Sequence, residues 1–337
     1  MQTNSPKTSL RVAVLHGGGY VGMWMIELLL RHPEVSLKWV TSRSGAGRPV
    51  YSVHPTLFGK TSLLFSAPEE VDYNEVDVVF ITAEHKQGVY VVMNLLEQGY
   101  KGKIIDLSAD FRFEDASLYP TWFGYEHPAP DLLPLFQYGL VEVYETLIRE
   151  SRYVANPGCF ATALNLALYP LSGSLSGTHF HITAMTGASG SGNKASAGTH
   201  FPNRNGNVRT YKVLNHQHQP EILQTCGAET RFSFVPVSGP WTYGIWASIQ
   251  FSAEVTKKQL DEWYYEAYGN QPGIRLWPSL PELLPVVGTP FCDLGTAAGK
   301  REGVVVVAID NLWKGAASQA IQNMNLMTGL PVMKGLL

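Results

Sequence analysis

A cysteine stands at the junction between a strand-like run and a helix-like run, where a thiol can act as a nucleophile. In the stretch RYVANPGCFATALNLALYPL, Pro157 and Gly158 precede Cys159, and the apolar run after the cysteine is typical of a buried helix. The partial positive charge at a helix N-terminus favours thiolate over thiol. A cysteine that only packs in the core is the alternative interpretation, although packing rarely needs a thiol at such a corner. We therefore predict that Cys159 is a nucleophile.

Two histidines and a glutamate follow in the stretch NHQHQPEI, at His216, His218 and Glu221. A nucleophilic thiol needs a nearby group that accepts a proton and later returns it, and histidine does both near pH 7. If a helix starts at Pro220, Glu221 lies near its N-terminus, where its carboxylate can orient an imidazole. Both histidines stay open as the acid/base, and His218 is favoured because Glu221 follows it by three residues.

A metal site is the other interpretation of these histidines, because HFH at His179–His181 repeats the His-x-His spacing. The HFH segment lies in a strand-like run beside Phe180, and no pair of cysteines accompanies either motif. We therefore predict that the chain holds no metal.

A glycine-rich turn near the N-terminus has the G-x-G-x-x-G spacing of dinucleotide-binding proteins. In VLHGGGYVGMW it comes directly after a strand-like run and before a helix-like run. Glycines permit the tight turn and let the backbone approach a pyrophosphate, whose charge sits at the helix N-terminus. A purely structural turn is the alternative interpretation. The predicted cofactor contacts here are Gly17, Gly19, Tyr20, Val21 and Gly22.

The end of the second predicted strand indicates which dinucleotide binds. NAD-binding proteins usually carry Asp or Glu there, for the ribose hydroxyls. This chain has no acid at that place and offers Ser42 and Arg43 instead. A hydroxyl and a guanidinium suit a 2′-phosphate, so the sequence predicts NADP; a solvated arginine on a loop is the alternative.

Further polar side chains and a second glycine-rich loop, TGASGSGNK, follow predicted strands. The N–H groups of such a loop can hold a nicotinamide carboxamide or an oxyanion. IDLSADFR resembles an anion clamp, and the basic residues suit a phosphorylated or carboxylated substrate. The predicted cofactor contacts of this group are Ser189, Gly190, Gly192 and Asn311, and the predicted substrate contacts are Ser108, Arg112, Asn156, Arg209 and Lys212.

The elements that must position these residues change character near the cysteine. In the first half, apolar runs alternate with helical patterns, which favours a parallel sheet with crossover helices. Longer strands follow, some alternating apolar with polar residues, which favours a mixed or antiparallel sheet. The sequence thus predicts an α/β fold, with a Rossmann-type domain before an α+β catalytic domain. The strands predicted in the first half are Leu10–Leu15, Ser36–Thr41, Val76–Thr82, Lys103–Ser108 and Arg152–Asn156, and 111–134 is predicted to be a covering loop.

The composition excludes several classes of protein. The 337 residues carry 25 basic and 28 acidic side chains, a formal charge of −3, so no basic excess indicates a nucleic-acid partner. Three widely spaced cysteines argue against a disulfide framework. No apolar run approaches the roughly 20 residues that span a bilayer, and the polar N-terminus lacks a signal-peptide core. We expect a cytoplasmic protein without a membrane partner.

Together these motifs resemble the N-acetyl-γ-glutamyl-phosphate reductases of arginine biosynthesis, which are related to the aspartate-semialdehyde dehydrogenases. The stretch VANPGCFATA matches the active-site signature of that family at every position. The other matching stretches occur in the family's order along nearly the whole chain: GGGYVG, TSRSGAG, LSADFR, GTHFP, NHQHQPEI and IDNLWKGAASQAIQNMNLM.

The resemblance implies NADPH-dependent reduction of an N-acetyl-γ-glutamyl phosphate to the semialdehyde and phosphate, through a thioester on Cys159. It implies that a histidine of HQH is the acid/base and that Glu221 supports it. It also implies that the C-terminal helix completes the nucleotide domain, so we expect residues 1–156 and 315–337 to form one domain and 157–314 the other. The second domain would also carry the contacts of a homodimer or homotetramer.

The chain departs from the family pattern at three places near the cofactor. The family turn usually reads G-x-x-G-Y-x-G, and its first glycine falls on His16. The family often has Pro-His-Gly where this chain has Glu84, His85 and Lys86. Trp24 stands where a glutamate is common.

Other functions stay open at this point. A carrier-linked α-aminoadipyl-phosphate reductase of lysine biosynthesis resembles this chain through TSRSGAGRPVYSVHPTLFGK and the histidine segment, and would add an acyl carrier protein as partner. An N-succinyl substrate is also possible, whereas aspartate-semialdehyde dehydrogenase has a different thiol motif. A non-catalytic NADP-binding sensor and a thiol hydrolase are the alternatives from other classes.

Overall fold

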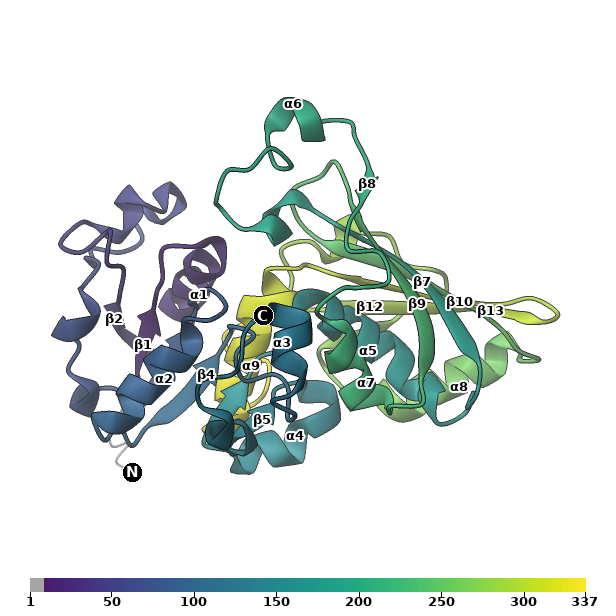
Figure 1. The fold of residues 1–337 in the computed structure, drawn as a ribbon, viewed down its shortest axis with the longest axis horizontal. Helices are drawn as coiled ribbons and strands as arrows, with labels where there is room; N and C mark the ends of the chain where they lie inside the picture. The colour runs from purple at the N-terminus through teal and green to yellow at the C-terminus, as the bar shows by residue number, and fades with distance from the viewer. Residues whose placement is uncertain (1–8) are drawn as a thin grey trace, which may run out of the picture.

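The computed structural model describes residues 9–337, in which the chain builds two β-sheets. Figure 1 shows the six-stranded sheet and its helices at one end of the molecule and the seven-stranded sheet at the other. The N-terminal half of the chain forms the first sheet, and the second half forms the second. The predicted α/β fold, a parallel Rossmann-type sheet followed by a mixed sheet, is confirmed.

The first sheet is parallel throughout, with the strand order β2-β1-β3-β4-β6-β5. Helices cover both of its faces, and the central strands are therefore nearly continuous runs of buried apolar residues. Its strands are β1 (Leu10–Leu15), β2 (Val35–Val40), β3 (Val78–Ile81), β4 (Lys103–Asp106), β5 (Phe136–Tyr138) and β6 (Tyr153–Ala155).

The connections of this sheet hold its helices and several short 3₁₀ turns. The predicted covering loop at 111–134 contains α3, whose aromatic side chains Tyr119 and Phe123 pack with Phe113. The α-helices are α1 (Tyr20–Arg31), α2 (Gly88–Glu97), α3 (Leu118–Phe123) and α4 (Val141–Glu150). The 3₁₀ turns are Val50–Ser52, Pro55–Leu57, Pro68–Glu70, Tyr73–Glu75 and Pro130–Leu135.

The second sheet is mixed and has the strand order β11-β12-β13-β10-β7-β9-β8. β7 pairs in parallel with β9 and antiparallel with β10. Along β7, buried side chains alternate with exposed or half-buried ones, so only one face of the strand meets the core. Its strands are β7 (His179–Thr186), β8 (Arg209–Thr210), β9 (Arg231–Ser238), β10 (Ile245–Ser252), β11 (Ile274–Leu276), β12 (Cys292–Ala298) and β13 (Glu302–Ile309).

Helices α5, α7 and α8 cover the buried face of the second sheet (Figure 1). The core between them includes Phe160, Phe180 and Phe234, each at most 2% exposed. The helices and turns of this half are α5 (Cys159–Ser172), α6 (Phe201–Arg204), α7 (Gln219–Cys226), α8 (Lys257–Tyr268), Ala188–Ser191 and Leu284–Val286. None of the helices described in residues 9–337 is long and apolar enough to cross a bilayer.

After β13 the chain returns to the first sheet. A π-helical turn, Trp313–Ala317, leads into α9 (Ser318–Met327), which packs against α4, β4 and α1. Helix α9 buries polar as well as apolar side chains. Gln319 donates a hydrogen bond to Thr162 on α5 (2.9 Å), and Asn323 donates one to Asn156 (3.1 Å). The C-terminal helix is thereby joined to both sides of the predicted nucleophile.

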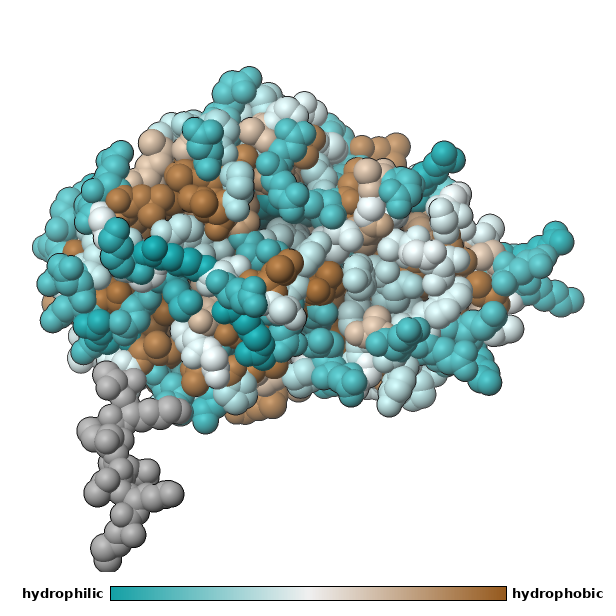
Figure 2. Space-filling model, turned by 90° about the horizontal axis from the view of Figure 1, so that it is seen from below, coloured by the Kyte–Doolittle hydropathy of each residue, from teal (hydrophilic) through white to brown (hydrophobic). Residues whose placement is uncertain are grey.

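Figure 2 shows the molecule from below, where hydrophobic side chains are interspersed with hydrophilic ones over the whole face. The brown residues are most numerous at the end that carries the six-stranded sheet. No continuous apolar surface covers this face.

Candidate active site

A cavity of about 730 Å³ lies where the two halves of the chain meet. Its wall is made of segments that follow β1, β3, β4, β6, β7 and β13, together with residues 211–218. The carboxyl ends of parallel strands are the usual place for a ligand in such sheets. The predicted site residues on this wall are Gly19, Tyr20, Val21, Gly22, Arg112, Asn156, Cys159, Ser189, Gly190, Gly192, Lys212, His216, His218 and Asn311.

The remaining predicted residues lie off the cavity wall. Glu221 is fully buried behind it. Ser108 is also buried: its hydroxyl donates to Asp106 (2.6 Å) and accepts the N–H of Asp110 (3.1 Å). Arg209 packs against the loop at Gly198, on which a Cβ would lie 2.2 Å from its guanidinium. Gly17, Ser42 and Arg43 lie at the turn after β1 and at the end of β2.

Cys159 is the first residue of α5 and is half-buried on the cavity wall. Gly158 precedes the helix in an extended conformation. Burial raises the pKa of the Cys159 thiol to about 11, while Arg112 acts in the opposite direction. The backbone N–H groups at the helix N-terminus also lower this pKa, as expected, but loss of solvation outweighs them. The thiol needs a base to react.

Gly158 lets two functional side chains approach the loop before Cys159 closely. A Cβ at this position would lie 2.4 Å from Nε2 of His218 and 2.8 Å from Nη1 of Arg112. Gly315 plays a similar part on the other side of the thiol, since its Cβ would lie 2.9 Å from Cβ of Cys159. Any larger residue at these positions would displace the reacting groups.

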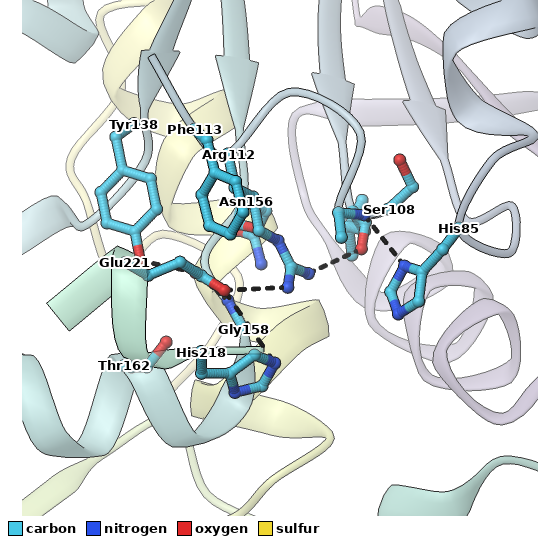
Figure 3. A network of polar contacts seen from close by, with 12 residues as sticks. His85, Ser108, Arg112, Phe113, Tyr138, Asn156, Gly158, Thr162, His218 and Glu221 are labelled. Carbon is cyan, nitrogen blue, oxygen red and sulfur yellow. Dashed lines mark hydrogen bonds and ion pairs between the residues drawn. The ribbon is translucent and has the colours of Figure 1, made fainter. Parts of the chain in front are cut away.

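Glu221 is the centre of a buried network behind the cavity (Figure 3). Its Oε2 accepts hydrogen bonds from the Tyr138 hydroxyl (2.7 Å) and from the Gly158 N–H (2.9 Å). Its Oε1 pairs with Nη1 of Arg112 at 3.4 Å and lies 4.0 Å from Nε2 of His218. The carboxylate thus holds the loop before the nucleophile and Arg112 more closely than it holds the histidine.

The two histidines have different surroundings. The backbone N–H of His218 donates to Nδ1 of His216 (3.2 Å), and Phe160 and Phe234 pack against the His216 ring. Nδ1 of His218 is buried and has no hydrogen-bond partner in the described residues. Burial lowers the pKa of both rings, and Arg112 lowers that of His218 further. Both are neutral at pH 7, so each ring has one nitrogen without a proton.

Hydrogen bonds to backbone carbonyl groups fix the Arg112 side chain on the cavity wall. Its Nε donates to the Asn156 carbonyl (2.9 Å) and its Nη2 to the Leu107 carbonyl (3.0 Å). The side chain is only 6% exposed. Because a guanidinium has five N–H donors, some remain available to an anion in the cavity.

The turn after β1 has the geometry of a pyrophosphate site. A Cβ on Gly22 would lie 2.5 Å from the Gly17 carbonyl oxygen, so α1 packs directly on the turn. No side chain caps the N-terminus of this 12-residue helix, and its first turn carries no acid. The N–H groups there can therefore bind an anion, and the residues present fit the pyrophosphate of a dinucleotide. His16, at the place of the family's first glycine, has a φ of 61°.

Arg43, after β2, forms an exposed ion pair with Glu69 (2.8 Å). Ser42 lies beside the glycine turn, with its hydroxyl 3.5 Å from where a Cβ on Gly18 would stand. The hydroxyl and the guanidinium thus lie at the end of β2, where the sequence analysis expects the ribose.

The second glycine-rich loop is tied to both halves of the chain. Asn311 donates to the Ser189 hydroxyl (3.0 Å) and accepts the Gly244 N–H (2.6 Å). Beyond Ala188–Ser191, Lys194 pairs with Glu84 after β3 (2.6 Å), and Asn193 donates to the Gly18 carbonyl (3.3 Å). These last contacts join the loop to the nucleotide turn.

The segment before the histidines has unusual backbone conformations. Lys212 and Leu214 have φ values of 45° and 58°, which L-residues rarely adopt. Lys212 donates to the Gln217 side chain (2.6 Å) and lies on the cavity wall. Such strain is found most often where a segment must present particular groups to a ligand.

Three residues of the site were missed by the sequence analysis. His85 lies on the cavity wall, Tyr138 holds Glu221, and Asn323 holds Asn156. His85 was noticed only as part of a departure from the family pattern. Tyr138 and Asn323 carry no signal in the sequence, because their partners lie 83 and 167 residues away. No group of three or more potential metal ligands gathers anywhere in residues 9–337.

Comparison with known proteins places both halves in one family. A model of the NAD binding domain of semialdehyde dehydrogenases matches residues 11–151. A model of the semialdehyde dehydrogenase dimerisation domain matches residues 159–311. The chain therefore has a nicotinamide-dinucleotide domain followed by a dimerisation domain.

Curated relatives match along almost the whole chain. An N-acetyl-gamma-glutamyl-phosphate reductase of Methanopyrus kandleri is 40% identical over 335 residues, which cover 96% of this chain and 97% of the relative. A protein described as a LysW-L-2-aminoadipate 6-phosphate reductase, from Thermomicrobium roseum, is 39% identical over 344 residues, with 96% and 97% covered.

Solved structures share the fold at low sequence identity. Aspartate semialdehyde dehydrogenase II of Vibrio cholerae, complexed with ASA, has a TM-score of 0.73 at 18% identity, covering 95% of this chain and 98% of that one. The Candida albicans enzyme with NADP has a TM-score of 0.68 at 15% identity, with 95% and 98% covered. From the family models and the curated relatives, the chain belongs to the semialdehyde dehydrogenase family that includes the N-acetyl-gamma-glutamyl-phosphate reductases.

Proposed function

We propose that the protein reduces N-acetyl-γ-glutamyl phosphate to N-acetyl-glutamate 5-semialdehyde and phosphate, with NADPH as reductant. The observation that carries the proposal is that one cavity joins Cys159, a neutral His218 and the glycine turn of a dinucleotide domain. The name and close match of the Methanopyrus kandleri relative support this acyl phosphate as substrate.

The first step is removal of the thiol proton. Burial raises the pKa of Cys159 and lowers that of His218, so the resting pair is a thiol and a neutral imidazole. The neutral His218 imidazole accepts the proton as the sulfur attacks the acyl carbon. Glu221 and Gly158 keep the loop and Arg112 in place during this transfer.

The attack forms a thioester on Cys159 and releases inorganic phosphate. Backbone N–H groups in the first turn of α5 stabilise the oxyanion, and Arg112 offsets the charge of the leaving phosphate. Reduced nicotinamide, when bound, supplies the hydride that reduces the thioester. The thiolate then leaves as the aldehyde forms, and His218 returns the proton to the sulfur.

NADP is the proposed cofactor, because Ser42 and Arg43 stand at the end of β2, where an acid would favour NAD. Among the predicted substrate contacts, Arg112, Asn156 and Lys212 lie on the cavity wall and are the ones we assign to the substrate. Ser108 and Arg209 stay predictions, with Ser108 acting through the buried network.

A carrier-linked aminoadipyl phosphate is the second candidate substrate. The observation that favours it is the match to the Thermomicrobium roseum protein, which is as extensive as the match to the arginine-type relative. An acyl carrier protein would then be a partner.

The experiment that tests the reaction is the reverse assay with N-acetyl-glutamate semialdehyde, NADP and phosphate, followed by the absorbance of the reduced cofactor. Phosphate-dependent reduction of NADP supports the arginine-type reaction. Turnover only with the carrier-linked aminoadipate semialdehyde supports the second candidate. Cofactor binding without turnover on either substrate contradicts both.

We also propose that the protein is a homodimer or homotetramer in the cytoplasm. The match of residues 159–311 to a dimerisation domain supports self-association, and three free thiols suit a reducing compartment. Analytical ultracentrifugation measures the state directly, and a monomer at micromolar concentration contradicts it.

A further inference from the structure

His85 is a cavity residue to which the proposed mechanism gives no role. It follows β3 and lies on the cavity wall with Arg112, Lys212 and His218. Figure 3 shows it on one side of Arg112, with Glu221 and His218 on the other. It therefore faces the space where the acyl phosphate must lie if Cys159 is to attack it.

A backbone contact fixes the tautomer of this ring. The N–H of Ala109 donates a hydrogen bond to Nδ1 of His85 (3.1 Å), so Nδ1 is the acceptor nitrogen. A neutral imidazole carries its single proton on the other nitrogen. In residues 9–337 no protein group accepts a hydrogen bond from Nε2 of His85, and this donor is available to a ligand.

An aromatic contact and the backbone around it position the exposed ring. It packs against Phe123 with 5.5 Å between ring centroids. The next residue, Lys86, has a φ of 70°, and its N–H donates to the buried Asp110 carboxylate (2.8 Å). These contacts anchor the loop next to the ring and orient Nε2 towards the cavity.

Nearby charges keep the ring neutral while making its surroundings positive. His85 is exposed at the cavity, yet the loss of solvation from the surrounding protein and the Arg112 guanidinium lower its pKa to about 4. Lys212 also lowers this pKa, whereas Asp110 and Glu221 raise it. At pH 7 the imidazole is a neutral donor beside two cations that face the same cavity.

We propose that His85 positions the phosphoryl group of the substrate, with its Nε2–H donating a hydrogen bond to a phosphoryl oxygen. In the reverse direction the same group holds inorganic phosphate. Arg112 and Lys212 supply the charge, and His85 supplies a directed donor to one phosphoryl oxygen. This inference rests on the proposed function, because it needs a phosphorylated substrate.

The test compares two substitutions of the same residue. In His85→Asn the amide oxygen can still accept the Ala109 N–H, but no donor reaches the place of Nε2. In His85→Gln the amide N–H reaches that place. Inorganic phosphate affinity is measured in the presence of NADP by the protection of Cys159 from iodoacetamide. The affinity should fall about tenfold in His85→Asn, as for one lost hydrogen bond to a charged group, and should largely return in His85→Gln.

Three results would overturn the proposal. Unchanged phosphate affinity in His85→Asn would exclude the contact. An equal loss in both variants would show that the ring acts only through its shape. Absence of protection by phosphate in the wild-type protein would exclude a phosphate site. NADP affinity must stay the same in all three proteins, which separates this contact from a change in the cofactor site.

A measurement without any substitution guards against misfolded variants. Phosphate added to the ¹⁵N-histidine-labelled protein should shift the Nε2 resonance of His85 much more than its Nδ1 resonance, and no shift would contradict the proposal. The aldehyde assay reports separately on the proposed function. Phosphate binding at His85 without turnover of N-acetyl-glutamate semialdehyde would count against that substrate and support the phosphate contact.

Discussion

Gly158 shows how a residue without a side chain can determine an active site. Its Cα stands where His218, Arg112 and the Glu221 carboxylate converge, and its N–H is one of the groups that the carboxylate holds. The motif around Cys159 was recognisable from the sequence. The reason for the glycine was not, since it depends on side chains far away in the chain, with Arg112 before it and His218 after it.

We predict that Gly158→Ala lowers kcat/KM by about a hundredfold, because the added methyl group displaces His218 and Arg112. A displacement of about 1 Å of catalytic groups typically lowers the rate by this factor. Gly173→Ala is the matched control, since its Cβ would meet nothing within 4 Å and its φ is −76°. Steady-state kinetics of both variants make the test. Equal activity in the two variants would contradict the role given to Gly158.

Asp106 is a buried carboxyl group beneath the cavity. Burial and the nearby Asp110 raise its pKa from 3.8 to about 7, although Ser108 donates two hydrogen bonds to it. Between pH 4 and pH 7 the unfolded chain therefore loses this proton while the folded chain keeps it. The contribution of Asp106 to stability falls as the pH rises through that window.

We predict that Asp106→Asn removes this pH dependence, because the amide has no proton to lose. The free energy of unfolding of the variant minus that of the wild type should be larger at pH 8 than at pH 5. Urea unfolding at the two pH values measures the difference. If the gap between variant and wild type is the same at both, Asp106 does not titrate as proposed.

At the scale of elements, the patterns that predicted the fold were the long and regular ones. The predicted strand Leu10–Leu15 is β1, and the long apolar runs of the second half became β7, β9, β10 and β13. β5 has only three residues, and β12 reads CDLGTAA, with too few large apolar residues to stand out. Both are strands because neighbouring strands supply their hydrogen bonds, which no local pattern reveals.

Two loop positions also have a backbone conformation that the local sequence does not predict. His16 and Lys86 stand where the family pattern has glycine, and both have positive φ. The backbone there keeps the conformation that glycine adopts readily, so tertiary contacts override the preference of the side chain. The departures in sequence therefore do not signal a departure in fold.

The contact between Glu84 and Lys194 joins two loops at the mouth of the cavity. We predict that Glu84→Gln speeds dissociation of the nicotinamide cofactor by up to about fivefold, the usual range for an exposed ion pair. Glu262→Gln, which breaks the exposed pair with Lys258 on α8, is the matched control. Stopped-flow fluorescence of the reduced cofactor measures the rates. High salt should raise the dissociation rate of the wild type close to that of the variant. An unchanged rate in Glu84→Gln would show that this ion pair does not retain the cofactor.

At the scale of the whole molecule, a buried ion pair fastens the C-terminal segment to the nucleotide half. Lys314 in the π-helical turn is fully buried and donates to Glu142 on α4 (2.6 Å) and to Gln322 on α9 (2.8 Å). The next residue is Gly315, which packs against Cys159. The ion pair that stabilises the fold thus also fixes the segment that packs against Cys159.

We predict that Lys314→Met destabilises the protein by about 3–5 kcal/mol, because it leaves the Glu142 carboxylate buried without its partner. The double variant with Glu142→Leu should recover most of this loss, since two apolar side chains replace the pair. Chemical denaturation of the two single variants and the double variant measures the coupling. Additive losses would show that the two residues do not act as a pair.

The hydrogen bonds of α9 also set an order of events during synthesis. Asn323 lies 167 residues after its partner Asn156, and Gln319 lies 157 residues after Thr162. N-terminal segments leave the ribosome first, so the glycine turn can fold long before the loop of Cys159 receives these two contacts. A growing chain therefore completes both its reactive centre and the helix packing on α1 and β4 only after its last described helix has emerged.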